Sequence, residues 1–265
     1  MKEVQKYLQR INYSGELSPT LEVLSQLQRS HLMTVPFENL DIHIGRRIII
    51  DNSYQKIVNE RRGGFCYELN SVFRWLLDEI GFRTKMVSAR VFNKETKTFG
   101  QEFDHLAIIA TLDRDYLVDV GFGEFAMSPL PLMKGFIHHD PRGDFIIEDF
   151  MEEYFVVNKI VGNEKVPEYI FTTCSRSPDE FTAMCEYHQT SPESHFTQKI
   201  IVSLPTEEGR KTISGNVFKV SEGGRVIETT IQSVEEFTRL LMEQFAMVLP
   251  AYEGKLIAAP ERIQK

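Results

Sequence analysis

The ten residues 61–70, Arg-Arg-Gly-Gly-Phe-Cys-Tyr-Glu-Leu-Asn, constrain the fold more than any other stretch of the chain. Gly63 and Gly64 interrupt regular structure immediately before Cys66. After the cysteine, apolar residues recur at spacings of three and four, the pattern of the buried face of a helix: Leu69, Val72, Phe73, Leu76, Leu77 and Ile80. The sequence therefore predicts a helix that begins at or beside Cys66 and ends at Gly81.

Cys66 has two interpretations. At a helix N-terminus, unpaired backbone N–H groups and the helix dipole stabilise an anion, by about 0.3–1 kcal/mol from the dipole alone. The neighbouring cations Arg61 and Arg62 would add to this stabilisation of a thiolate. The alternative is a small buried hydrophobe, since free cysteine is among the most buried residue types. The paired glycines and the helix start favour a reactive thiol.

Composition excludes several classes of protein. Among 265 residues, 42% are hydrophobic and 26% charged, as in ordinary globular proteins, and the net charge of −8 argues against nucleic-acid and anionic-membrane partners. The first residues lack the apolar core of a signal peptide, and no apolar run approaches the roughly 20 residues of a spanning helix. Three scattered cysteines do not suggest a disulfide framework. We expect a cytoplasmic protein with reduced thiols.

The periodicity changes twice along the chain, which predicts a helical part (1–80), a strand-rich part (81–190) and a smaller mixed part (191–265). Ser18 and Pro19 resemble a helix start, and the helix that follows must end before Pro36. Residues 35–40 and 121–143 are expected to be irregular. Further helices are expected at 4–11, 53–61 and after a capping box at 233–236. Strands are expected at 82–92, 105–112, 116–120, 145–147, 154–157, 199–204, 216–220 and 225–230.

A cysteine nucleophile needs a base, and the base needs a group that orients it. Of seven histidines, His105 stands out because it opens an apolar strand, where a polar ring needs a partner. The alternative is a solitary core histidine. Asp119 interrupts another apolar strand, and a buried carboxylate is costly unless it is paired. Asp104, Asp113 and Asp115 lie in more exposed contexts.

The expected hairpin does not by itself bring this histidine and aspartate together. A turn centred on Arg114 pairs residue 105 with 123 and residue 119 with 109. His105 and Asp119 then share a face but lie about four residues apart, or about 13 Å. A bulge or bend would have to close this gap.

A metal site is a rival interpretation of other residues. Cys174, Cys185, His188 and His195 carry suitable ligand atoms, and Cys185 and His188 have a feasible spacing. The paired Cys-x-x-Cys motifs of structural zinc sites are missing. We therefore expect no metal cofactor.

Four stretches within the first 130 residues resemble, in order, the motifs of the arylamine N-acetyltransferases. They are Val-Pro-Phe-Glu-Asn-Leu at 35–40, Arg-Gly-Gly-Phe-Cys-Tyr-Glu-Leu-Asn at 62–70, His-Leu at 105–106 and Val-Asp-Val-Gly-Phe-Gly at 118–123. The combination of the second and fourth motifs is highly specific, although neither alone is. Beyond residue 130 the resemblance is fainter, at 190–192 and 209–210.

The resemblance implies a catalytic triad of Cys66, His105 and Asp119. It implies an α+β fold with a cysteine-protease-like core: an N-terminal helical bundle (1–80) carrying the nucleophile, a central β-barrel (81–190) carrying His and Asp, and a C-terminal α/β lid (191–265). It also implies that Phe37 and Phe122 line the acceptor pocket. The candidate coenzyme A contacts that follow are Gln101, Phe103 and Asp104, with Gln101 standing where the family has a threonine.

The implied reaction is acetyl transfer from acetyl-CoA, the donor substrate, to the nitrogen of small aromatic amines or hydrazines through an acetyl-cysteine. Because the protein is acidic, anionic coenzyme A requires a local basic cluster, for which Lys199, Arg210 and Lys211 are candidates. Two alternatives use the same residues. One is a hydrolase or transglutaminase-like acyltransferase with the same triad, and the other is a binding module that keeps the triad without turnover.

Overall fold

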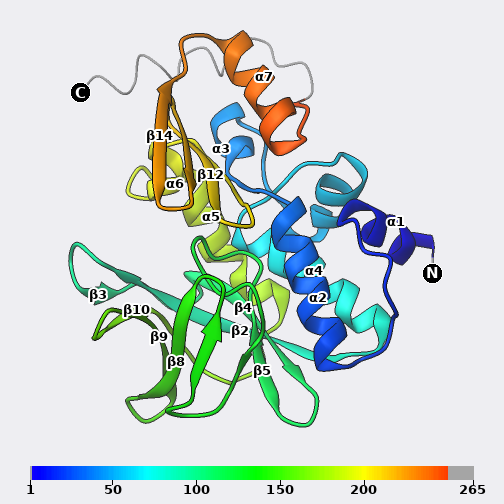
Figure 1. Cartoon of the computed structure of the whole chain (residues 1–265), viewed down its shortest axis with the longest axis vertical. Coiled ribbons are helices and arrows are strands. Elements are labelled where there is room, and N and C mark those ends of the chain that lie inside the picture. The colour runs from blue at the N-terminus through cyan, green and yellow to red at the C-terminus, as the bar shows by residue number, and fades with distance from the viewer. Residues whose placement is uncertain (1, 250–265) are drawn as a thin grey trace. The chain divides into compact units, whose positions relative to one another are not determined.

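The computed structural model describes residues 2–249 and divides into two compact units (Figure 1). The first unit comprises Met1–Asn12, His31–Phe65 and Glu186–Lys265, and the second comprises Tyr13–Ser30 and Cys66–Cys185. Each contains helical segments and a β-sheet, so the expected α+β class is confirmed. The division into three lobes at 80 and 190 stays a prediction.

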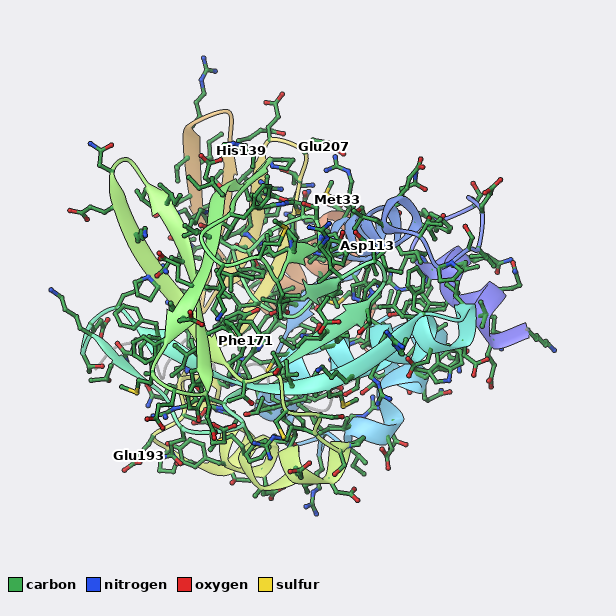
Figure 2. All side chains as sticks on the ribbon, turned by 90° about the horizontal axis from the view of Figure 1, so that it is seen from below. Met33, Asp113, His139, Phe171, Glu193 and Glu207 are labelled. Atoms are coloured by element: carbon green, nitrogen blue, oxygen red, sulfur yellow. The ribbon has the colours of Figure 1, made fainter. Side chains whose placement is uncertain are left out.

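The second unit is built on one large antiparallel sheet that curves into a nearly closed barrel, in the order β6-β5-β4-β2-β10-β9-β8-β7, with β3 beside β2. The strands are β2 (Arg83–Asn93), β3 (Thr98–Phe99), β4 (His105–Thr111), β5 (Asp115–Val118), β6 (Leu130–Pro131), β7 (Ile137–Asp140), β8 (Gly143–Phe150), β9 (Tyr154–Val161) and β10 (Glu164–Phe171). Apolar side chains fill its interior, and Phe171 lies among them (Figure 2). Helix α4 (Cys66–Ile80) packs against β2 and β4.

The first unit contains a five-stranded sheet in the order β1-β11-β12-β13-β14. Its strands are β1 (Phe37–Glu38), β11 (Ile201–Pro205), β12 (Gly209–Ser214), β13 (Val217–Glu222) and β14 (Arg225–Thr230). Helix α7 (Val234–Phe245) lies beside these strands in Figure 1 and shares one apolar cluster with them. The unit also holds α1 (Lys2–Arg10), α3 (Leu40–Ile44) and α6 (His195–Gln198).

Local signals predicted the helices with the clearest apolar stripes. Helix α4 begins at Cys66 and ends before Gly81, whose φ of +105° suits a residue without a side chain. Helix α7 starts as expected, because the Ser233 hydroxyl accepts a hydrogen bond from the N–H of Glu236. Helix α2 (Leu21–Thr34) ends before Pro36, but its cap is Thr20 and not Ser18: the Thr20 hydroxyl accepts from the N–H of Val23.

Several elements differ from the expectation. The irregular stretch 35–40 contains β1, which pairs with β11, and 121–143 contains β6 and β7. Strands β10 and β12 and helix α5 (Thr182–Thr190) were not predicted. The segment near 53–61 is helical, with a π-type turn at Gln55–Asn59 preceded by a 3-10 turn at Ile50–Asn52. Strands of two residues are too short to show a periodic pattern. Strand β10 was not predicted because Pro167, which lies at a bulge, is unusual within a strand.

A buried cluster of four charged side chains stabilises the first unit. The Arg62 guanidinium lies 2.8 Å from Glu38 and 2.9 Å from Asp41, and the Lys56 ammonium lies 3.0 Å from Asp41 and 3.5 Å from Glu38. All four side chains are almost completely buried. Two cations therefore face two carboxylates, so that each buried charge is compensated.

Arg62→Met should lower the free energy of unfolding by about 3–5 kcal/mol, because the two buried carboxylates would then share one buried cation, Lys56, with the partly exposed Arg46 at 4.0 Å from Asp41. Urea unfolding followed by circular dichroism measures this loss. The matched control is Arg74→Met, which removes a partly exposed ion pair with Asp78 and should cost less than about 1 kcal/mol. Equal losses in the two variants would contradict the special role of the buried cluster.

The cluster also makes stability depend on pH. Burial raises the pKa of the Asp41 carboxyl, but the charges of Lys56 and Arg62 outweigh that effect and hold its pKa below the usual value. Such a carboxyl contributes stability above its unfolded pKa of about 3.9 and loses it as the pH falls through the folded value. The Arg62→Met variant should therefore lose stability at a higher pH than the wild type.

Within residues 2–249, no helix has both the length and the apolar character needed to cross a membrane.

Candidate active site

Cys66 is the first residue of α4, and the chain after β5 packs directly against it. A Cβ atom placed on Gly121 would lie 2.8 Å from the Cα of Cys66 and 3.1 Å from its carbonyl oxygen. Only glycine fits at this approach without a backbone shift. Both residues belong to the second unit, as do His105 and Asp119.

His105 and Asp119 are joined by a hydrogen bond of 2.6 Å between Nε2 and a carboxylate oxygen. The predicted hairpin register is wrong, because β4 and β5 place Ile108 opposite Val118, two residues away from the expected pairing. Asp119 is thus in line with residue 107, about 7 Å along the strand from His105. It also lies just past the end of β5, where the chain bends, and the side chains span the remaining gap.

The Asp119 carboxylate accepts four hydrogen bonds. One oxygen accepts from the Asn70 amide and the N–H of Gly121, both at 2.9 Å. The other accepts from His105 and, at 3.2 Å, from the Tyr169 hydroxyl. Since the carboxylate is 1% exposed, these bonds compensate for its lost hydration. They also fix the ring, with a proton on Nε2 facing the carboxylate.

Asn70 links helix α4 to the two chain segments that carry His105 and Asp119. It lies four residues after Cys66, so the two residues share a face of α4. Its amide nitrogen also donates to the carbonyl of Leu106 at 2.6 Å, and its amide oxygen accepts from the N–H of Val120 at 2.9 Å. The helix start that carries Cys66 is thereby tied to the residues beside His105 and Asp119.

Two aromatic rings complete the surroundings of His105. The Phe122 ring lies 5.1 Å from the imidazole and the Tyr169 ring 5.4 Å, measured between centroids. Phe122 was expected in the acceptor pocket. Tyr169 was not predicted to belong to the site, because its strand, β10, was itself missed.

The chain matches the model of the N-acetyltransferase family over residues 20–253. Human arylamine N-acetyltransferase 1 is 30% identical, over 93% of this chain and 94% of its own length. This chain belongs to the arylamine N-acetyltransferase family. Among solved structures, the arylamine N-acetyltransferase from M. tuberculosis matches with a TM-score of 0.85 and 30% identity, covering 92% of this chain and 93% of that one. The Mycobacterium marinum enzyme in complex with CoA matches with a TM-score of 0.88 and 27% identity, covering 98% and 99%.

In this N-acetyltransferase, burial raises the pKa of the Cys66 thiol well above its ordinary value, and the charges of Cys185, Asp104 and Asp119 act in the same direction. The backbone N–H of Tyr67 has the opposite, smaller effect. A solitary thiolate is therefore disfavoured at Cys66, in contrast to the expectation from the helix dipole and arginines. The thiol needs an adjacent proton acceptor.

The candidate coenzyme A contacts lie in the turn before β4. Gln101 is exposed, and Phe103 and Asp104 are partly buried. The Asp104 carboxylate accepts a long hydrogen bond, 3.4 Å, from the N–H of Val91 and does not hydrogen-bond to His105. The roles of these residues toward a cofactor stay predictions.

The remaining predicted residues of the N-acetyltransferase lie in the first unit. Phe37 in β1 pairs with Ser203 in β11, and its ring lies 6.0 Å from that of Phe196. The expected basic cluster is not grouped at one place: Arg210 and Lys211 lie opposite Pro205 and Leu204 at one end of β11, whereas Lys199 precedes the other end, about five residues or about 16 Å away. The Arg210 guanidinium donates to the Ser203 hydroxyl at 2.7 Å, and Lys199 is exposed. It stays a prediction that these residues bind substrate: Phe37, Lys199, Arg210 and Lys211.

The rival metal ligands are not assembled into a cluster. Cys174 is exposed, Cys185 is buried, and His188 lies 3.1 Å from the Ser194 hydroxyl. Among residues 2–249, no group of three or more histidine, cysteine, aspartate or glutamate side chains is arranged to hold a metal ion.

Proposed function

We propose that this enzyme transfers an acetyl group from acetyl-CoA to the nitrogen of arylamines or arylhydrazines through an acetyl-Cys66 intermediate. The observation that carries the proposal is the buried His105–Asp119 pair, 2.6 Å apart, which is hydrogen-bonded through Asn70 to a helix that begins with Cys66. The names of the relatives support the acceptor class, and the complex of the Mycobacterium marinum enzyme with CoA supports the donor.

His105 is the proposed general base. Its Nε2 donates to Asp119, which leaves the lone pair of Nδ1 to take the thiol proton. Moving that proton from Cys66 to His105 leaves the net charge of the triad unchanged. The burial that penalises a solitary thiolate therefore penalises the thiolate–imidazolium pair much less. Asp119 stabilises the imidazolium, and its other hydrogen bonds keep it in place.

The acetyl group then moves in two steps. The Cys66 sulfur attacks the thioester carbonyl, the carbon–sulfur bond to coenzyme A breaks, and the imidazolium protonates the departing thiolate. Backbone N–H groups near Cys66 are the proposed donors to the oxyanion. In the second step the acceptor nitrogen attacks acetyl-Cys66 while His105 takes its proton. Cys66 leaves as the thiolate and completes the cycle.

The substrate contacts are proposed from the family motifs. Phe37 and Phe122 would hold the aromatic ring of the acceptor. Gln101, Phe103 and Asp104 would contact coenzyme A, and Lys199, Arg210 and Lys211 are the candidates to meet its phosphates. The Phe122 ring lies 5.1 Å from the imidazole between centroids, so an acceptor ring stacked on Phe122 would lie close to the proposed base.

The enzyme is expected to follow ping-pong kinetics. Because coenzyme A leaves before the amine reacts, double-reciprocal plots at several amine concentrations should give parallel lines. Incubation with acetyl-CoA alone should add one acetyl mass to the peptide that contains Cys66. Initial-rate measurements and peptide mass spectrometry test the two expectations separately.

Each alternative has its own result. Intersecting lines with an unmodified Cys66 peptide would show direct attack of the amine on acetyl-CoA and would refute the intermediate. Release of coenzyme A without acetylated amine would identify a hydrolase. A titratable Cys66 thiol with neither reaction would identify a binding module that keeps the triad.

A further inference from the structure

The turn that leads into His105 contains an unusual backbone conformation. Phe103, two residues earlier, has a φ of +66°, in the left-handed region that bulky side chains rarely occupy. Such residues persist only where their surroundings fix them, and they gather at functional sites. The contacts that hold Phe103 therefore bear on the position of His105.

Side-chain hydroxyls hold both backbone groups of Phe103. Its N–H donates to the Ser88 hydroxyl of β2 at 2.7 Å, and its carbonyl accepts from the Tyr67 hydroxyl at 2.7 Å. The Tyr67 hydroxyl also lies 3.2 Å from the carbonyl oxygen of Asp104. The turn is thus fixed from β2 on one side and from α4 on the other.

Tyr67 connects this turn to Cys66, the proposed nucleophile. It follows Cys66 in the first turn of α4 and is fully buried. Its ring lies 6.0 Å from that of Phe181, which in turn lies 5.2 Å from that of Phe103. One rigid side chain therefore spans from the residue after Cys66 to the two residues before His105.

We propose that Tyr67 is a positioning residue for acyl transfer, whose hydroxyl sets the spacing of Cys66 and His105 by fixing the Phe103–Asp104 turn. The proposal rests on the proposed function of Cys66. Burial raises the pKa of Tyr67 well above its ordinary value, and the charges of Cys66, Asp104 and Cys185 add to this effect. The hydroxyl is thus a donor at every pH at which the thiol and imidazole exchange a proton.

Loss of this hydroxyl should affect the chemistry more than the fold. Proton transfer from Cys66 needs the imidazole at hydrogen-bond distance, and a displacement of about 1 Å can cost about a hundredfold in rate. A loosened pair also stabilises the thiolate less, so Cys66 becomes reactive only at a higher pH.

The test compares Tyr67→Phe with the wild type at several pH values. One readout is the p-nitrophenolate burst when p-nitrophenyl acetate acylates Cys66, and the other is the pH midpoint of Cys66 alkylation by iodoacetamide. We expect a burst slower by about tenfold or more and a midpoint shifted upward. The matched control is Tyr116→Phe, which removes the hydroxyl of another buried tyrosine of the second unit, one that donates to Asp113. It should leave both readouts at wild-type values.

Four results would overturn the inference or its basis. The inference fails if Tyr67→Phe has the same burst rate and the same pH midpoint as the wild type. It also fails if the burst is slower only in proportion to the loss of folded protein and the pH midpoint does not move. If Tyr67→Phe does not fold, Ser88→Ala removes the other hydroxyl that holds Phe103, and an unmoved midpoint there overturns the inference equally. If the wild type itself shows no acylation of Cys66, the proposed function fails instead.

Discussion

Cys66→Ser is expected to lower acetyl transfer by a factor of about 10⁴ or more while the protein still folds. A serine hydroxyl has a far higher pKa than a thiol, so the same imidazole cannot deprotonate it at comparable cost. Acetylation of an arylamine by acetyl-CoA measures the rate, and thermal unfolding by circular dichroism measures the fold.

Cys174→Ser is the control for this substitution. Its thiol is exposed, and it should retain wild-type turnover. Turnover of Cys66→Ser within a few-fold of the wild type would remove Cys66 from the role of nucleophile. Loss of activity in both variants would point to a general effect of thiol replacement.

Asp119→Asn is expected to reduce the rate of Cys66 acylation by about 10³–10⁴, the size of effect known for a triad aspartate. The reason lies in the four hydrogen bonds at the carboxylate. One oxygen faces two N–H donors, from Asn70 and Gly121, so the asparagine must place its own oxygen there. Its amide nitrogen then faces His105.

That orientation reverses the hydrogen bond to the imidazole. An amide nitrogen donates, so Nε2 of His105 must present its lone pair, and the ring proton moves to Nδ1. The nitrogen intended to accept the thiol proton is then already protonated. The burst of p-nitrophenolate from p-nitrophenyl acetate measures the acylation step without interference from the acceptor amine.

Asp113→Asn and Asp115→Asn are the matched controls. Asp113 is exposed and bonds to Arg114 and Tyr116, whereas Asp115 accepts from the Thr111 hydroxyl at 2.6 Å. Neither touches the imidazole, so both variants should keep wild-type acylation rates. Similar rates in all three variants would shift the orienting role to Asp104 or to a water molecule.

The sequence predicted those parts of the site that depend on local chemistry. The glycines and the apolar stripe were enough to locate the start of α4 at Cys66, since helix periodicity and breakers act within a few residues. His105 and Asp119 could be selected because each is a polar residue in an apolar strand, where burial demands a partner.

Other parts depend on pairings between distant segments. The predicted hairpin register was wrong because the turn between β4 and β5 is centred on Asp113 and not on Arg114. Both turns leave the same residues on the same face of the hairpin, so the apolar pattern fits either one. Tyr169 could not be predicted as part of the site, because Pro167 and a bulge interrupt the sequence pattern of its strand. Asn70 carried a weak signal, a polar residue on the cysteine side of α4, but its three hydrogen bonds are made to residues 36 to 50 positions away.

The confinement of this machinery to the second unit bears on how the enzyme family can diversify. The described hydrogen bonds of Asp119 and His105 are all made by residues between Cys66 and Cys185. Phe37 and the basic residues of β12 belong to the other unit. Changes in β12 can therefore alter proposed substrate contacts without altering any described hydrogen bond of Asp119 or His105. Changes in β1 would also affect Gly64, two residues before Cys66, whose carbonyl accepts from the N–H of Glu38. On the proposed assignment, residues 66–185 carry the chemistry, and β12 is open to changes in the substrate on which the chemistry acts.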